Sequence, residues 1–176
     1  MKHTAISGAL FLLIISCTSN EKSHIEGDAS SFIKAVAVIH PINNSEVSGV
    51  AYFEQTENGV HVRAEVNGLT GEKHGFHIHT FGDCTATDGT STGGHFNPYG
   101  FEHGAPDSLD RHMGAMGNLE VNEDGVGIRD YTDHVIVMEE IIGRGIIIHG
   151  GEDDLQSQPS GASGPRVGCG VIGIQN

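Results

Sequence analysis

The sequence predicts an all-β domain, an eight-stranded antiparallel sandwich or barrel with two long functional loops at about 80–116 and 150–166. Three observations support this prediction. From residue 33 onward, short apolar or alternating runs are separated by Gly, Asn and Asp. Glycine is unusually frequent, with 26 among 176 residues and no collagen-like period. No run of ten or more residues shows a convincing helical period.

The expected strands follow one another at short intervals. Ile33–His40 is rich in β-branched residues, and a Pro-Ile-Asn-Asn turn separates it from the next run. Gly117–Asn122 and Val126–Asp130 flank Glu-Asp-Gly, which is typical of a hairpin. The other strand-like runs, in chain order, are Val47–Gln55, Val60–Val66, His74–His79, His134–Met138, Gly145–His149 and Val167–Ile174. Loops as long as the two that interrupt this series are usually functional in a compact β domain.

The N-terminus resembles a bacterial lipoprotein leader. One basic residue, Lys2, precedes an apolar run that is too short to span a bilayer, and Ile-Ile-Ser-Cys ends it at Cys17. We expect a signal peptide at 1–16, a lipid on Cys17, a flexible tether at 17–32 and the folded domain at 33–176. An ordinary signal peptide and an uncleaved anchor are the alternatives. An Asp directly after the cysteine would indicate retention in the inner membrane, and this chain has none there. We therefore expect a lipoprotein of the bacterial cell envelope that is anchored in the outer membrane and faces the periplasm.

The chain has three cysteines. If Cys17 carries lipid, Cys84 and Cys169 remain as a pair in an oxidising compartment, where a disulfide is their natural use. Two free thiols are the alternative.

The formal net charge of -14 restricts the partners. A surface this acidic argues against nucleic acid and against electrostatic docking on anionic lipid. The membrane is therefore expected to be reached only through the N-terminal lipid.

Histidine is also abundant, with 12 residues in the chain. His77 and His79 are two apart on an expected strand, so both rings point to one face and can reach one metal. The other four candidate ligands lie in the first long loop and at a strand end: His95, His103, His112 and His149. Imidazole ligands suit copper and zinc.

The sequence around these histidines resembles the copper–zinc superoxide dismutase family over about residues 33–176. The motifs that carry the resemblance are Gly75–His79, Gly82–Cys84, Gly93–Pro98, His103–Pro106, Arg111-His112, Gly117-Asn118, Asp153–Leu155 and Gly164–Ile174. The resemblance implies a Greek-key barrel with one copper and one zinc per subunit. It also implies dismutation of superoxide to dioxygen and hydrogen peroxide, with copper alternating between Cu(II) and Cu(I), in protection of the cell envelope.

The resemblance also assigns roles to residues. It implies copper ligands at His77, His79, His95 and His149, and zinc ligands at His95, His103 and His112. His95 would bridge the two metals and take up a proton when it leaves copper, and Arg166 would hold the superoxide anion. Asp153 would link a copper histidine to a zinc histidine. Cys84 and Cys169 would form the family disulfide.

One position departs from the family pattern. The pattern after the last zinc histidine is His-x-Gly-Asp, whereas this chain has His112-Met113-Gly114-Ala115. We therefore expect the zinc-ligand Asp to be replaced by Ala115 and the fourth zinc ligand to be missing. Zinc would then bind weakly, take a water, or use a carboxylate from Glu102, Asp107 or Asp110.

Two other functions remain open on the sequence. One is a copper-only dismutase with an empty zinc half-site, and the other is a non-catalytic envelope protein that binds copper or zinc. Superoxide is the expected partner in the enzymatic readings. A homodimer stays open beside a monomer.

Overall fold

The computed structural model describes residues 34–175 together with Met1. The expected signal peptide, Cys17 and the tether therefore lie outside the described residues. The strands are β1 (Lys34–Pro41), β2 (Ser48–Thr56), β3 (Gly59–Asn67), β4 (Lys73–His79), β5 (Ala115–Val121), β6 (Gly127–Asp133), β7 (Gly145–His149), β8 (Arg166–Val171) and β9 (Gly173–Ile174). Two short helices, η1 (Thr90–Thr92) and α1 (Met138–Ile141), complete the fold.

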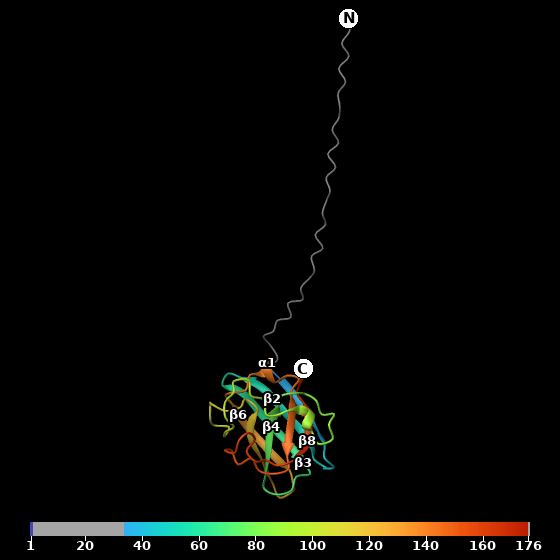
Figure 1. The fold of residues 1–176 in the computed structure, drawn as a ribbon, viewed down its shortest axis with the longest axis vertical. Coiled ribbons are helices and arrows are strands. Elements are labelled where there is room, and N and C mark those ends of the chain that lie inside the picture. The colour runs from blue at the N-terminus through green and yellow to red at the C-terminus, as the bar shows by residue number, and fades with distance from the viewer. Residues whose placement is uncertain (2–33, 176) are drawn as a thin grey trace.

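The eight longer strands form a closed antiparallel barrel (Figure 1). Their hydrogen-bonded order is β2-β3-β6-β5-β4-β7-β8-β1, and β1 also pairs with β2, which closes the ring. The connections β3–β4 and β6–β7 each pass over two intervening strands, which is Greek-key topology. The all-β, eight-stranded prediction is confirmed.

Alternating side chains produce this barrel. In β3 the buried residues are Val60, Val62, Ala64 and Val66, and the residues between them point outward. Residues of the same kind from the other strands join one continuous apolar core. Among the described residues, no helix is long and apolar enough to cross a membrane.

The prediction of a strand at His134–Met138 is wrong. This segment is a turn followed by the first residue of α1. The carboxylate of Asp133 accepts hydrogen bonds from the backbone amides of Val135 and Ile136, which folds the chain back on itself after β6. Apolar residues of this segment, Ile136 and Met138, are buried against the core without joining a strand.

The two long loops lie where the sequence predicts them, over residues 80–114 and 150–165. A disulfide between Cys84 and Cys169 joins the first loop to β8. The pairing expected from the cysteine count is therefore confirmed, and free thiols at these positions are excluded.

Candidate metal centre

The first part of the site is built on β4. Phe76 and Ile78 point into the apolar core, whereas His77 and His79 point to the opposite face and are buried beneath the loops. β4 pairs with β7, whose last residue is His149. These strands bring three histidines to one place.

The first loop adds three more histidines. Backbone hydrogen bonds from Phe96 to Ile78 and from Thr80 to Gly94 hold this loop against the end of β4, so that His95 lies beside His79. His112 lies just before β5, and His103 lies in the loop between them. The result is two clusters whose ring nitrogens lie within 4.8 Å of one another: His77, His79, His95 and His149 in one, and His95, His103 and His112 in the other.

The hydrogen bonds of these rings show which nitrogens face a metal. His77 is bound through Nε2 to Asp153, His79 through Nδ1 to the carbonyl of Gly93, and His149 through Nδ1 to the carbonyl of Gly164. The buried ring nitrogens without a hydrogen-bond partner in the described part of the chain are Nδ1 of His77, Nε2 of His79, Nε2 of His149, Nδ1 of His103, Nδ1 of His112 and both nitrogens of His95. Buried polar atoms are normally satisfied, so this set fits one metal on each side of His95.

Burial also keeps these rings unprotonated and ready to coordinate. It lowers the pKa of His79 to about 2 and the pKa of His149 to about 3. The pKa of His95 is lowered further by burial and by its neighbours His77 and His79. Neutral imidazole is the form that binds metal.

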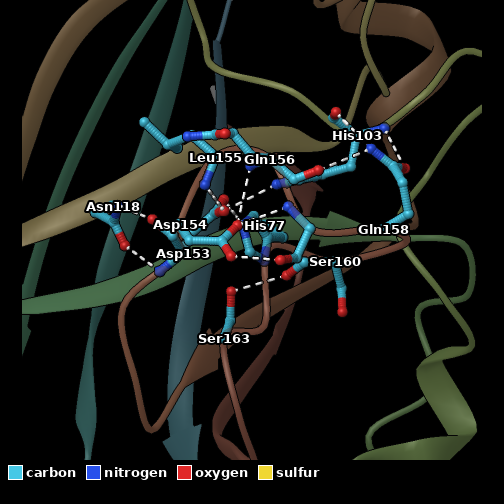
Figure 2. Close-up of polar contacts among 11 residues, drawn as sticks. His77, His103, Asn118, Asp153, Asp154, Leu155, Gln156, Gln158, Ser160 and Ser163 are labelled. Carbon is cyan, nitrogen blue, oxygen red and sulfur yellow. Dashed lines mark hydrogen bonds and ion pairs between the residues drawn. The ribbon is translucent and has the colours of Figure 1, made fainter.

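Asp153 connects the two clusters, as Figure 2 shows. Its Oδ2 lies 2.8 Å from Nε2 of His77, and its Oδ1 lies 2.8 Å from Nε2 of His103. Burial acts to raise the pKa of Asp153, but the hydrogen bonds from His103 and His77 outweigh it and hold that pKa below its usual range. An ionised carboxylate here fixes both rings with their Nδ1 atoms toward the metals.

The expectation of a zinc site that has lost its carboxylate at Ala115 is wrong. The three zinc histidines are assembled, and the buried carboxylate of Asp153 belongs to this half-site through His103. The substitute carboxylates expected from the sequence were all near His103 and His112 along the chain, whereas the fold brings Asp153 to this half-site from the second loop. Glu102, Asp107 and Asp110 are outside both clusters, and Ala115 is buried in β5 opposite His77.

Arg166 lies at the edge of the copper half-site. It opens β8 and pairs with His149 across the sheet. Its guanidinium donates to the carbonyl oxygens of Gly89 and Gly93 and to the hydroxyl of Thr92. A half-buried cation is thus fixed beside the copper histidines.

Several neighbours of the site had no role in the sequence analysis. His74 contacts the carbonyl oxygens of His149 and Thr70 through its two ring nitrogens, so it supports a copper ligand without being one. The side chain of Asn118 pairs with the backbone of Asp153. The sequence signal for Asn118 was its place in a Gly-Asn motif. No comparable signal marked Thr92 or His74.

A closed antiparallel barrel that holds two metal half-sites joined by one histidine defines a metalloenzyme with a copper and a zinc position. Residues 47–172 match the family Copper/zinc superoxide dismutase (SODC), and the chain belongs to this family. It is a superoxide dismutase, with a copper site of four histidines and a zinc site of three histidines that is linked to Asp153. The copper-only and non-catalytic alternatives are therefore set aside.

Two individual proteins illustrate the likeness. The Extracellular superoxide dismutase [Cu-Zn] of Drosophila melanogaster is 40% identical over 188 residues, which cover 99% of each chain. Among solved structures, that titled Crystal Structure Analysis of the clock protein EA4 superimposes with a TM-score of 0.74 at 36% identity, covering 81% of this chain and 95% of the other.

Proposed function

We propose that this chain removes superoxide outside the cytoplasm, with Arg166 holding the anion at the copper half-site and His95 handling a proton. The observation that carries the proposal is the position of Arg166. Its guanidinium is fixed by three oxygens, and the backbone of Arg166 in β8 lies opposite the copper histidine His149 of β7.

Copper bound by the four histidines supplies the one-electron exchange that oxidises one superoxide to dioxygen and reduces a second, with two protons, to hydrogen peroxide. Arg166 supplies the attraction. The chain carries a formal charge of -14, so its overall field repels an anion. A fixed cation beside the metal can still focus the local field on the site.

His95 is the residue best placed to hold a proton. Both of its ring nitrogens are buried and have no hydrogen-bond partner in the described part of the chain. Its pKa is depressed mainly by burial, so the ring is neutral before a metal binds. A ring nitrogen of His95 that is not held by a metal could accept a proton and pass it to a peroxide formed beside it.

The role of Arg166 is tested with the metal-loaded full chain. Arg166→Ala should lower the dismutation rate by about tenfold to a hundredfold and weaken its dependence on ionic strength, with copper still bound. Arg63→Ala is the matched control, because it removes the same charge from β3, which does not border β4 or β7. Equal rates for the two variants would exclude the role.

The chain is also proposed to be an envelope lipoprotein anchored through Cys17. The support is the leader sequence and the Cys84–Cys169 disulfide, which is typical of exported proteins. Growth with an alkyne-tagged fatty acid should label the full chain in the membrane fraction of a bacterial host, and Cys17→Ser should abolish the label. A Cys17→Ser chain that is still labelled would contradict the anchor.

A homodimer is the proposed assembly. Val38 of β1 and Val171 of β8 are exposed and line one shallow hollow over neighbouring strands, next to the exposed Ile174 of β9. Exposed apolar groups gathered in this way often mark a contact surface. Sedimentation of the full chain in detergent should give a dimer, and Val38→Lys should give a monomer. An unchanged mass in Val38→Lys would show that this surface is not the interface.

A further inference from the structure

The backbone of the zinc histidine His103 is held by one side chain of the second loop. The backbone N–H of His103 donates to Oε1 of Gln158 at 2.8 Å, and Nε2 of Gln158 donates to the carbonyl oxygen of His103 at 2.9 Å. Figure 2 shows the carboxamide of Gln158 facing the backbone of His103. The side chain thus satisfies both backbone polar groups of His103.

A second carboxamide, that of Asn118, binds the backbone of Asp153 in the same way. The carboxamide of Asn118 accepts from the backbone N–H of Asp153 at 2.8 Å and donates to its carbonyl at 2.9 Å. Asp153 in turn binds the His103 ring at Nε2. Two carboxamides therefore fix, respectively, the backbone of a zinc ligand and the backbone of the carboxylate that orients it.

His103 needs such support because of its position. It lies in the irregular part of the first loop, outside every strand and helix of the described chain. Its ring is oriented by Asp153, but a ring is only as fixed as the backbone that carries it. Gln158 also donates to the carbonyl of Gln156 at 3.1 Å, which orients the carboxamide itself.

We propose that Gln158 is a positioning residue for the zinc half-site. It fixes the backbone of His103 so that, with Nε2 bound to Asp153, Nδ1 faces the zinc position. The second loop, through Asp153 and Gln158, then holds His103 at ring, amide and carbonyl. Zinc retention depends on this loop, although the loop contributes no zinc-ligating histidine.

The test is the rate at which zinc passes from the metal-loaded full chain to a chromogenic chelator. Loss of a residue that orients a metal ligand typically costs 10–100-fold in metal affinity, and because Gln158 is exposed to water we expect about tenfold faster release in Gln158→Ala. Gln158→Glu should release zinc at least as fast, because an oxygen then faces the carbonyl of His103. Gln156→Ala is the matched control, since its side chain makes none of these contacts.

Two further measurements separate positioning from general stability. With Co²⁺ in the zinc half-site, the visible absorption should change in Gln158→Ala and not in Gln156→Ala. The melting temperature of the metal-free protein and the retention of copper should stay near those of the parent.

Equal zinc release in Gln158→Ala and Gln156→Ala would overturn the proposal. A parallel fall in copper retention and in metal-free stability would also overturn it, because Gln158 would then only stabilise the fold. The inference rests on the zinc half-site of the proposed function and is measured by metal retention. An inactive parent protein would contradict the proposed function, while the zinc release rates would still decide the role of Gln158.

Discussion

Arg166 donates a hydrogen bond of 2.9 Å from Nη1 to the hydroxyl of Thr92. This hydroxyl is fully buried, donates to the carbonyl of Gly89 and lies 3.2 Å from Nδ1 of His79. One side chain of η1 therefore contacts both the cation at the site and a copper ligand. The orientation of each depends on the same oxygen.

Replacing this hydroxyl should impair catalysis without removing copper. Thr92→Val keeps the shape of the side chain but removes one of the three hydrogen-bond acceptors that hold Arg166. Misplacement of a substrate-binding group costs up to about a hundredfold in rate. We expect about a tenfold lower dismutation rate with normal copper content, measured on the metal-loaded chain. Thr92→Ser retains the hydroxyl and should stay near the parent rate. A Thr92→Val chain as active as the parent would show that the two backbone carbonyls suffice for Arg166.

Gly161 allows the second loop to close over the metal centre. Its φ is +65°, and a Cβ at this position would lie 1.7 Å from Oδ1 of Asp153 and 2.7 Å from Nε2 of His103. Gly161→Ala should therefore break the link between these residues, lower stability by more than about 2 kcal/mol and accelerate zinc loss. Gly100→Ala is the control, because its φ is +70° and no atom lies within 4 Å of the new Cβ. Equal thermal midpoints and zinc release in the two variants would contradict the prediction.

The disulfide should contribute a large part of the stability. Cys84 and Cys169 are 85 residues apart, and closing a long loop removes much entropy from the unfolded chain. The double variant Cys84→Ser, Cys169→Ser should unfold at lower denaturant, with a loss of about 3 kcal/mol. Adding reductant should lower the midpoint of the parent and leave that of the double variant unchanged. A parent insensitive to reductant would show that the bond contributes little or is inaccessible.

A buried ion pair next to the zinc half-site should be costly to break. Nη2 of Arg111 lies 2.6 Å from Oδ2 of Asp133, and both side chains are fully buried. Arg111→Ala leaves a buried carboxylate unpaired and should cost about 3–5 kcal/mol in denaturant unfolding. Breaking the exposed Lys34–Glu54 pair with Lys34→Ala should cost less than about 1 kcal/mol. Similar losses in the two variants would mean that burial does not govern the Arg111 pair.

The metal-free protein should lose stability in acid. The unfolded chain protonates its histidines near pH 6.5, whereas burial lowers the pKa of His149 to about 3 and that of His79 to about 2 in the folded state. The unfolded state therefore binds more protons below pH 6.5, so stability falls as the pH drops from 6.5 toward 3. Urea midpoints of the metal-free chain at pH 7 and pH 4.5 measure this, and a higher midpoint at pH 4.5 would refute it.

The sequence was most informative where side-chain spacing reports directly on geometry. Alternation predicted the strands, and the two-residue spacing of His77 and His79 placed both on one face of β4. It failed at His134–Met138, where apolar residues are buried in a turn whose shape is set by the carboxylate of Asp133. Burial alone does not distinguish a strand from a packed turn.

The prediction of a defective zinc site was wrong for a different reason. Ala115 lies three residues after the last zinc histidine, His112, but Asp153 and Gln158 reach His103 from a separate loop. In the sequence, Gln158 lies between serines and a proline, and no motif marks it. Its role becomes visible only when the fold brings its carboxamide to the backbone of His103. The ligands and the linking carboxylate Asp153 could be predicted from the histidine spacing and the family resemblance, whereas Gln158 is recognised only by its tertiary contact with His103.

The closure of the barrel by β1 also affects how the chain behaves near other copies of itself. β1 hydrogen-bonds to β2 along one side and to β8 and β9 along the other. Within the described residues, the ring of eight long strands has no open edge onto which another strand could be added. Molecules concentrated on a surface by their N-termini would meet through side chains rather than through unpaired backbone amides. Such crowding should therefore not nucleate cross-β aggregates while the barrel remains closed.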